Sequence, residues 1–189
     1  MNEKLPNRKR VRAKYFNYSQ PGVYFITICT QNRQCTLSKI VGAGVPDGPQ
    51  NTLTEKGKIA QKYIEQLNSF YADISVDRYV IMPNHIHLLL RISYISDAQR
   101  GPSGTPVPTA QNSTLSRFVS TFKRFCNKEI GQNIWQSRSY DHIVRNEHDY
   151  IEISKYIEEN PLRWQYDTLY ENNKKGHAVA CPFLFWYIL

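Results

Sequence analysis

The sequence predicts an α+β domain with the ferredoxin-like βαββαβ order, followed by one further helix. Two observations carry this prediction. Runs of β-branched and aromatic residues alternate with amphipathic segments whose apolar residues recur at helical spacing. The segments follow one another as strand, helix, strand, strand, helix, strand, helix. In such a fold two helices cover one face of a central antiparallel sheet, so we expect the other face to be open.

The first half of the chain supplies three strands and one helix. The strand segments are β-branched and aromatic, and the helical segment follows Thr54, which is a favourable N-cap residue. A Gly/Pro-rich stretch, residues 41–51, is expected to be a loop. Pro83 and Asn84 are expected to turn a hairpin. The predicted strands are residues 22–31, 74–82 and 84–92, and the predicted helix runs from residue 54 to about 70.

The second half supplies two helices and a short strand. The first helix carries an apolar stripe of phenylalanines, with basic residues at its other positions. The last helix ends before Pro161, because a proline disfavours helical geometry at the residue that precedes it. The predicted helices are residues 115–130 and 147–160, and the predicted extended segment is residues 135–145.

Length and composition fit one folded domain with tails. The chain has 189 residues, 41% of them hydrophobic, which suffices for a sizeable core. We expect a flexible basic arm at residues 1–14, a domain at 15–166 that contains a mobile loop at 96–114, and a tail at 167–189. The end of the tail is apolar, so we expect it to pack on the domain; docking in a groove, pairing as an extra strand and a frayed sequence end are the alternatives.

The charge favours a nucleic-acid partner. The net charge is +8, and the chain has 13 Tyr, 8 Phe and 3 Trp, so cations for phosphates and rings for bases are both abundant. The four cysteines form no CxxC pair, which argues against zinc and disulfide frameworks and fits a reducing cytoplasm. No secretory signal and no membrane-spanning stretch is expected.

Two histidines in the run MPNHIHLLL are the first candidate site residues. Side chains on a strand alternate between its faces, so His85 and His87 point the same way. Two imidazoles on one rigid face can hold a metal ion or contact a phosphate. The alternative is an exposed strand face that happens to carry two histidines.

The last helix adds two more candidates. Tyr150, Ile153 and Ile157 define its buried stripe, and Tyr156 lies beside that stripe. Asn160 follows four residues later, on the same side of the helix as Tyr156. Two imidazoles and an amide oxygen give three ligands for a divalent cation and leave coordination positions open, as a catalytic metal requires.

Several motifs together resemble those of one family. HIH resembles the HUH motif (His, apolar, His) of single-strand nucleases, and YIEENP resembles the nucleophile helix of the REP-associated tyrosine transposases, a branch of the single-tyrosine HUH transposases. The opening RKRVRAKYFNYSQPGVYFITICTQNR, the FKRF helix and the segment WQ…YDHIVR are also similar to that family. The resemblance covers about residues 8–166.

The resemblance implies a metal-dependent single-stranded DNA nickase and strand transferase. Tyr156 would attack a phosphodiester and form a 5′-phosphotyrosine intermediate, while His85, His87 and Asn160 would bind Mg²⁺ or Mn²⁺. The substrate would be hairpin-bearing single-stranded DNA. The residues assigned to its backbone are Arg8, Lys9, Arg10, Arg12, Arg117, Lys123 and Arg124.

Some roles stay open at this point. Asp141 and His142 are candidate helpers in proton transfer, with a structural histidine as the alternative. Trp135 and Tyr140 could stack on bases or belong to the core. We expect a cytoplasmic, nucleoid-associated monomer or homodimer that does not bind membranes. The competing functions are a domesticated hairpin-DNA-binding protein with little turnover and an RNA-binding ferredoxin-like module.

Overall fold

The computed structural model describes residues 17–41, 49–94 and 113–170. The basic arm, most of the expected loop at 96–114 and the end of the tail lie outside these residues. The expected boundary between domain and tail, after residue 166, lies inside the last described range. Among the described residues, no helix is both long and apolar enough to cross a membrane.

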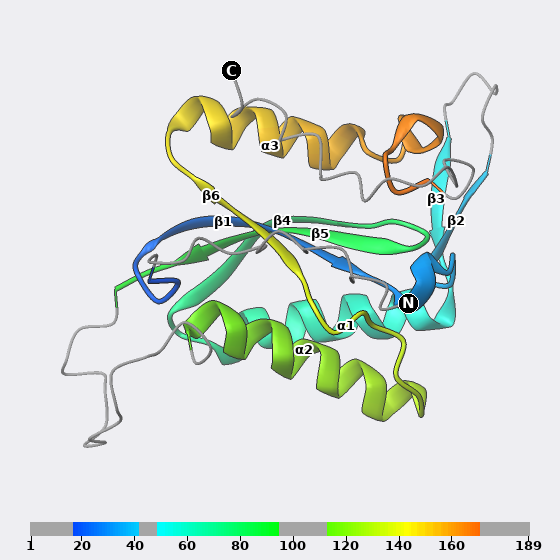
Figure 1. Cartoon of the computed structure of the whole chain (residues 1–189), viewed down its shortest axis with the longest axis horizontal. Coiled ribbons are helices and arrows are strands. Elements are labelled where there is room, and N and C mark those ends of the chain that lie inside the picture. Colours follow the sequence, from blue (N-terminus) through cyan, green and yellow to red (C-terminus); the bar gives the residue numbers. More distant parts are fainter. Residues whose placement is uncertain (1–16, 42–48, 95–112, 171–189) are drawn as a thin grey trace, which may run out of the picture.

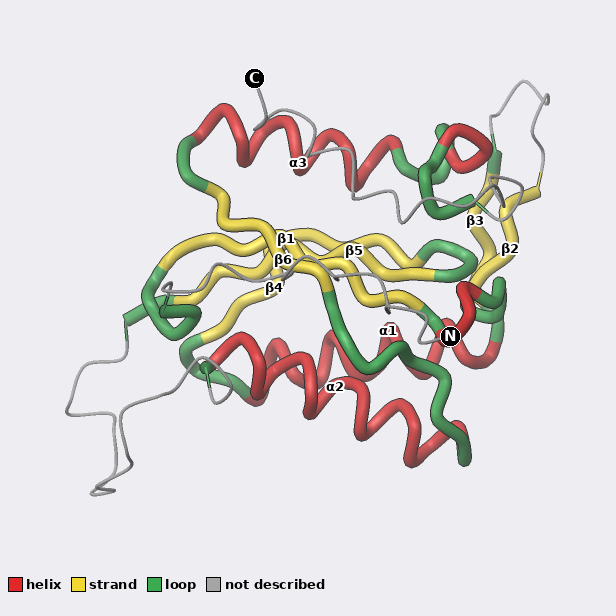
Figure 2. The backbone as a smooth tube through the Cα atoms, in the orientation of Figure 1, coloured by secondary structure: helices red, strands yellow, loops and turns green. Residues whose placement is uncertain are grey.

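The fold has three layers (Figure 1). The middle layer is a four-stranded antiparallel sheet in the order β4-β5-β1-β6. Helices α1 and α2 lie on one face of this sheet and α3 on the other (Figure 2). The strands are β1 (Gly22–Cys29), β4 (Ile74–Ile81), β5 (His85–Ile92) and β6 (Tyr140–Val144), and the helices are α1 (Glu55–Phe70), α2 (Thr114–Ile130) and α3 (Glu147–Glu159).

This arrangement confirms the α+β prediction and the βαββαβ order with an added helix. The β4–β5 hairpin turns at Pro83 and Asn84, as expected, and β5 is a central strand. The Thr54 side chain caps α1 by accepting a hydrogen bond from the Gly57 backbone N–H.

The prediction that residues 41–51 form a loop is wrong at both ends of that range, where the chain belongs to a β-hairpin. The strands β2 (Ser38–Val41) and β3 (Gln50–Leu53) pair with each other in a separate two-stranded sheet. The Asn51 side chain donates to the Ile81 carbonyl at 2.9 Å, and the Leu37 N–H donates to the Pro83 carbonyl at 3.0 Å. These bonds attach the hairpin to the β4–β5 turn, next to the start of β5.

The sheet has a core on each face, so the expected open face is wrong. Ile26 and Leu88 pack with α1 and α2, whereas Phe25 and Leu89 pack with Ile153 of α3. Residues directly opposite each other on paired strands share a face, and Phe25 pairs with Leu89. The face that carries the two histidines of β5 is therefore covered by α3.

Gly57 allows α1 to sit close to the chain that precedes it. A Cβ atom at this position would overlap the Leu37 carbonyl oxygen. That oxygen accepts hydrogen bonds from both the backbone N–H and the side-chain hydroxyl of Thr54, each at 2.9 Å. A residue without a side chain is thus required where α1 begins.

Candidate active site

The two histidines lie side by side on β5 and are buried. His85 is 0% and His87 1% exposed, and their ring centroids are 4.4 Å apart. The register pairs His87 with Thr27 of β1 and with Val80 of β4, which places it in the middle of the sheet. The prediction that both side chains share one face is confirmed.

One nitrogen of each imidazole is held by a neighbouring side chain. Asn84 donates its Nδ2–H to the Leu169 carbonyl at 2.7 Å, so its Oδ1 is the acceptor for His85 Nδ1, 2.8 Å away. We therefore assign the proton of His85 to Nδ1, which leaves a lone pair on Nε2. His87 Nδ1 hydrogen-bonds to the Thr27 hydroxyl at 2.9 Å. Both Nε2 atoms remain for other partners.

Helix α3 brings Tyr156 to the histidines. Its hydroxyl lies 3.4 Å from His87 Nε2 and 3.4 Å from Asp167 Oδ2. The ring packs edge-on against Phe25, with centroids 6.1 Å apart. Tyr156 is half-buried beside the stripe of Ile153 and Ile157, as the sequence predicted.

Asn160 and Asp167 complete the cluster. Asn160 is 2% exposed and donates its Nδ2–H to Asp167 Oδ2 at 3.2 Å. Asp167 is 7% exposed, and its other oxygen accepts the Leu169 backbone N–H at 2.6 Å. A short 3-10 helix, η3 (Trp164–Tyr166), turns the chain after α3 and delivers this carboxylate.

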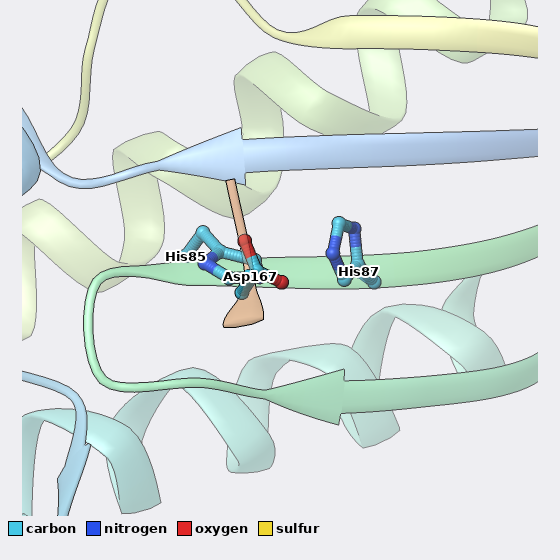
Figure 3. Close-up of side chains that lie close together, drawn as sticks. All are labelled: His85, His87 and Asp167. Atoms are coloured by element: carbon cyan, nitrogen blue, oxygen red, sulfur yellow. The ribbon is translucent and has the colours of Figure 1, made fainter. Parts of the chain in front are cut away.

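His85, His87 and Asp167 form a group that could hold a metal ion. Each offers one ligand atom, and these atoms all lie within 4.8 Å of one another. Figure 3 shows the three side chains gathered over β5, with Asp167 coming from the separate segment that follows α3. The three ligand atoms therefore converge from two parts of the chain, β5 and the segment after α3.

Burial keeps the imidazoles neutral. Burial, with a smaller contribution from the charge of Arg33, lowers the pKa of His85 to about 3. Burial and the neighbouring His85 hold the pKa of His87 well below its ordinary value, although the Asp167 carboxylate acts in the opposite direction. Neutral imidazoles are electron-pair donors, so this pair suits a cation and is poorly suited to a phosphate anion.

Unpartnered buried atoms support the same conclusion. Within the described residues, His85 Nε2 and Asn160 Oδ1 are buried and have no hydrogen-bond partner. Leaving such an atom unpaired costs about 1–3 kcal/mol, and a cation bound at His85 Nε2 would use that lone pair. The donor set thus fits a divalent metal ion.

The other candidate residues around β6 lie apart from this cluster. Asp141 pairs with Ile26 and faces α1 and α2, on the opposite side of the sheet. His142 shares the face of the histidines; burial lowers its pKa, and the carboxylate of Asp149, in the first turn of α3, acts in the opposite direction. Trp135 is 2% exposed and packs on Phe122, so it belongs to the core.

The three described residues that were assigned to DNA binding all lie on α2, which covers the other face of the sheet (Figure 1). Arg117 and Arg124 are exposed. The Lys123 ammonium donates to the carbonyls of Gln136, Ser137 and Arg138 at 2.8–3.4 Å, so it holds the segment that leads into β6. Arg8, Lys9, Arg10 and Arg12 lie outside the described residues.

Two residues of the cluster were missed by the sequence analysis. Asn84 could have been found, because a histidine ligand needs an acceptor for its second nitrogen and Asn84 is its chain neighbour. Asp167 gave no comparable signal: it follows Asn160 by seven residues, across a turn, at a spacing that belongs to no motif.

No protein-family model matches the chain. An uncharacterized protein of Haemophilus influenzae is 30% identical over 182 residues, which are 89% of this chain and 96% of that protein. A REP-associated tyrosine transposase of Escherichia coli K12 is 21% identical over 168 residues, 84% of this chain and 83% of that one. A solved structure of the REP-associated tyrosine transposase bound to a REP hairpin matches with a TM-score of 0.55 at 20% identity, over 90% of this chain and 96% of the other, and supports the fold.

Proposed function

We propose that this chain, which is similar to REP-associated tyrosine transposases at 21–24% identity, nicks hairpin-bearing single-stranded DNA and transfers the cut strand, with Tyr156 as the nucleophile. One observation carries the proposal. The Tyr156 hydroxyl, two neutral histidine nitrogens and the Asp167 carboxylate meet in one cluster, with the hydroxyl 3.4 Å from both His87 Nε2 and Asp167 Oδ2.

The reaction is a transesterification at phosphorus. The Tyr156 oxygen forms a bond to a backbone phosphorus atom, and the bond from that phosphorus to the 3′ oxygen breaks. The phenol loses its proton and the leaving 3′ oxygen takes one up, so the products are a 5′-phosphotyrosine link and a free 3′-hydroxyl. In strand transfer another 3′-hydroxyl attacks the phosphotyrosine and releases Tyr156. A free phenol has a pKa of about 10, so the hydroxyl needs activation at neutral pH.

His85, His87 and Asn160 are the proposed metal ligands, on the pattern of the family. When bound, the ion would polarise the scissile phosphate and stabilise the leaving oxygen. Two imidazole nitrogens favour Mn²⁺ over Mg²⁺, which prefers oxygen ligands throughout. His85 and His87 are held in place by Asn84 and Thr27 respectively, so the protein orients both rings before any ion arrives.

Substrate access requires a movement of the chain. His85 and His87 are almost fully buried, and the Trp164 ring lies tilted beside His85 with a centroid distance of 6.0 Å. A DNA phosphate therefore reaches the cluster only when α3, or the segment from Trp164 onward, moves away from the sheet. The N-terminal arm, Arg117 and Arg124 are proposed to bind the DNA backbone, and the related transposase bound to a REP hairpin supports a hairpin as the ligand.

The test is the capture of a covalent adduct. Single-stranded oligonucleotides that carry a hairpin and randomised flanks are labelled, incubated with the full-length protein and Mn²⁺ or Mg²⁺, and denatured. We expect a labelled protein band with the wild type and none with Tyr156→Phe. Tyr150→Phe is the matched control, because Tyr150 lies on the same helix and its hydroxyl donates instead to Asp77, at 3.2 Å.

The outcomes separate the candidate functions. An adduct that survives Tyr156→Phe means that another residue is the nucleophile. Hairpin binding without an adduct under any metal condition would favour the domesticated DNA-binding protein. Adduct formation that persists in the double variant His85→Ala, His87→Ala would remove the metal site from the reaction.

A further inference from the structure

The segment that follows α3 contributes the charged member of the cluster. Asp167 Oδ2 lies 4.0 Å from His85 Nε2, 3.2 Å from Asn160 Nδ2 and 3.4 Å from the Tyr156 hydroxyl. The Asp167 side chain is buried, at 3% exposure. A buried carboxylate is costly unless it is paired with a cation or fully hydrogen-bonded.

The contact between Asp167 and His85 is unfavourable without a cation. Because His85 carries its proton on Nδ1, its Nε2 presents a lone pair toward the negative oxygen of Asp167. Both atoms are acceptors, and 4.0 Å is too long for a hydrogen bond. A cation bound by both atoms would replace this repulsion with attraction.

Asn160 has a different geometry. Its side chain contacts the cluster through the donor Nδ2, which hydrogen-bonds to Asp167 Oδ2. An amide N–H cannot bind a metal ion, but it can fix the orientation of a carboxylate that does. Asn84 acts on the same segment, since its amide joins His85 Nδ1 to the carbonyl of Leu169, two residues beyond Asp167.

We propose that Asp167 is the anionic metal ligand of this site, with Asn160 and Asn84 as the residues that position it. This inference rests on the proposed function and changes one part of it: the third protein ligand comes from the segment after α3, and Asn160 supports that ligand. A carboxylate offers Mn²⁺ a full negative charge, which an amide oxygen does not. Two imidazoles and a carboxylate leave positions open for a DNA phosphate.

The test is a titration of the metal-free, full-length protein with Mn²⁺, in which free Mn²⁺ is followed by its electron paramagnetic resonance signal. We expect Asp167→Asn to raise the dissociation constant at least tenfold and Asn160→Ala to raise it less. The double variant His85→Ala, His87→Ala should abolish binding. Glu152→Gln is the matched control, because it removes one exposed carboxylate charge from α3.

Thermal unfolding distinguishes a ligand from a merely structural residue. An asparagine at 167 can still accept the Leu169 N–H, which Asp167 now binds at 2.6 Å, so the local turn is kept. Without metal, Asp167→Asn should change Tm little, because the removal of a buried charge offsets the loss of the acceptor for Asn160 Nδ2. With Mn²⁺, only the wild type should gain a large increase in Tm. A purely structural Asp167 would lower Tm equally in both conditions.

Two results would overturn the inference and leave the proposed metal site intact. One is unchanged Mn²⁺ affinity in Asp167→Asn together with loss of binding in the double histidine variant. The other is a larger loss in Asn160→Ala than in Asp167→Asn. Unchanged Mn²⁺ binding in the double histidine variant would instead refute the metal site itself.

Discussion

Asn84 is the residue on which the geometry of the cluster depends most. Replacing it with alanine removes both of its buried side-chain bonds, one to His85 Nδ1 and one to the Leu169 carbonyl. Each of the two groups left unpaired costs about 1–3 kcal/mol, so we expect Asn84→Ala to lower the free energy of unfolding by about 2–6 kcal/mol. In a chain of this size a loss of about 3 kcal/mol corresponds to a fall in Tm of roughly 6–12 °C.

Urea unfolding followed by circular dichroism measures this effect. Asn84→Asp should cost less, because it keeps the acceptor for His85 and loses only the donor to Leu169. Asn51→Ala is the control: this half-buried amide makes a single bond, to the Ile81 carbonyl, and its loss should cost about 1 kcal/mol. A cost for Asn84→Ala no greater than that of Asn51→Ala would refute the proposed role of Asn84.

Three further predictions concern stability and charge. Gly57→Ala should lower stability by about 1–3 kcal/mol, measured as a fall in Tm, because the new Cβ overlaps the Leu37 carbonyl; an unchanged Tm would contradict this. The folded-state pKa of His85 is about 3 against an ordinary 6.5, so the unfolded chain takes up the proton first as the pH falls, and stability is lost below pH 6.5. Between pH 7.5 and pH 5 this histidine alone should lower the free energy of unfolding, measured with urea, by about 2 kcal/mol. A free energy of unfolding that does not change with pH in this range would contradict a buried neutral imidazole. Lys123→Met should lower the free energy of unfolding by about 1–2 kcal/mol, because the ammonium donates to three backbone carbonyls. Arg117→Ala should weaken hairpin-DNA binding in filter assays and leave Tm unchanged. Equal destabilisation by the two substitutions would refute a structural role for Lys123 and a DNA-binding role for Arg117.

The sequence predicts the main elements of the fold well because their patterns are long. Strands and helices of eight residues or more repeat their apolar spacing several times, and β1, β4, β5 and the three α-helices were placed within a few residues of their ends. The strands β2 and β3 have four residues each, which is too short for alternation to stand out beside glycines and prolines.

The site was predictable only where its residues share one element. The i, i+2 spacing places His85 and His87 on one face of a strand, and the i, i+4 spacing aligns Tyr156 with Asn160, so both pairs followed from the sequence. Whether that face is open depends on how α3 packs back onto the sheet, which no local pattern records. Asp167 enters through a turn after the helix, where spacing carries no geometric information.

The claim that Tyr156 attacks DNA is tested most directly by locating the nucleotide on the protein. Trypsin cuts after Arg145, Lys155 and Arg163, so peptide 146–155 contains Tyr150 as its one tyrosine, and peptide 156–163 likewise contains Tyr156. After incubation with hairpin DNA and Mn²⁺, followed by nuclease and trypsin, mass spectrometry should find the added nucleotide mass on the peptide that carries Tyr156. Attachment to any other residue, under conditions in which the DNA is cut, would contradict the proposed mechanism.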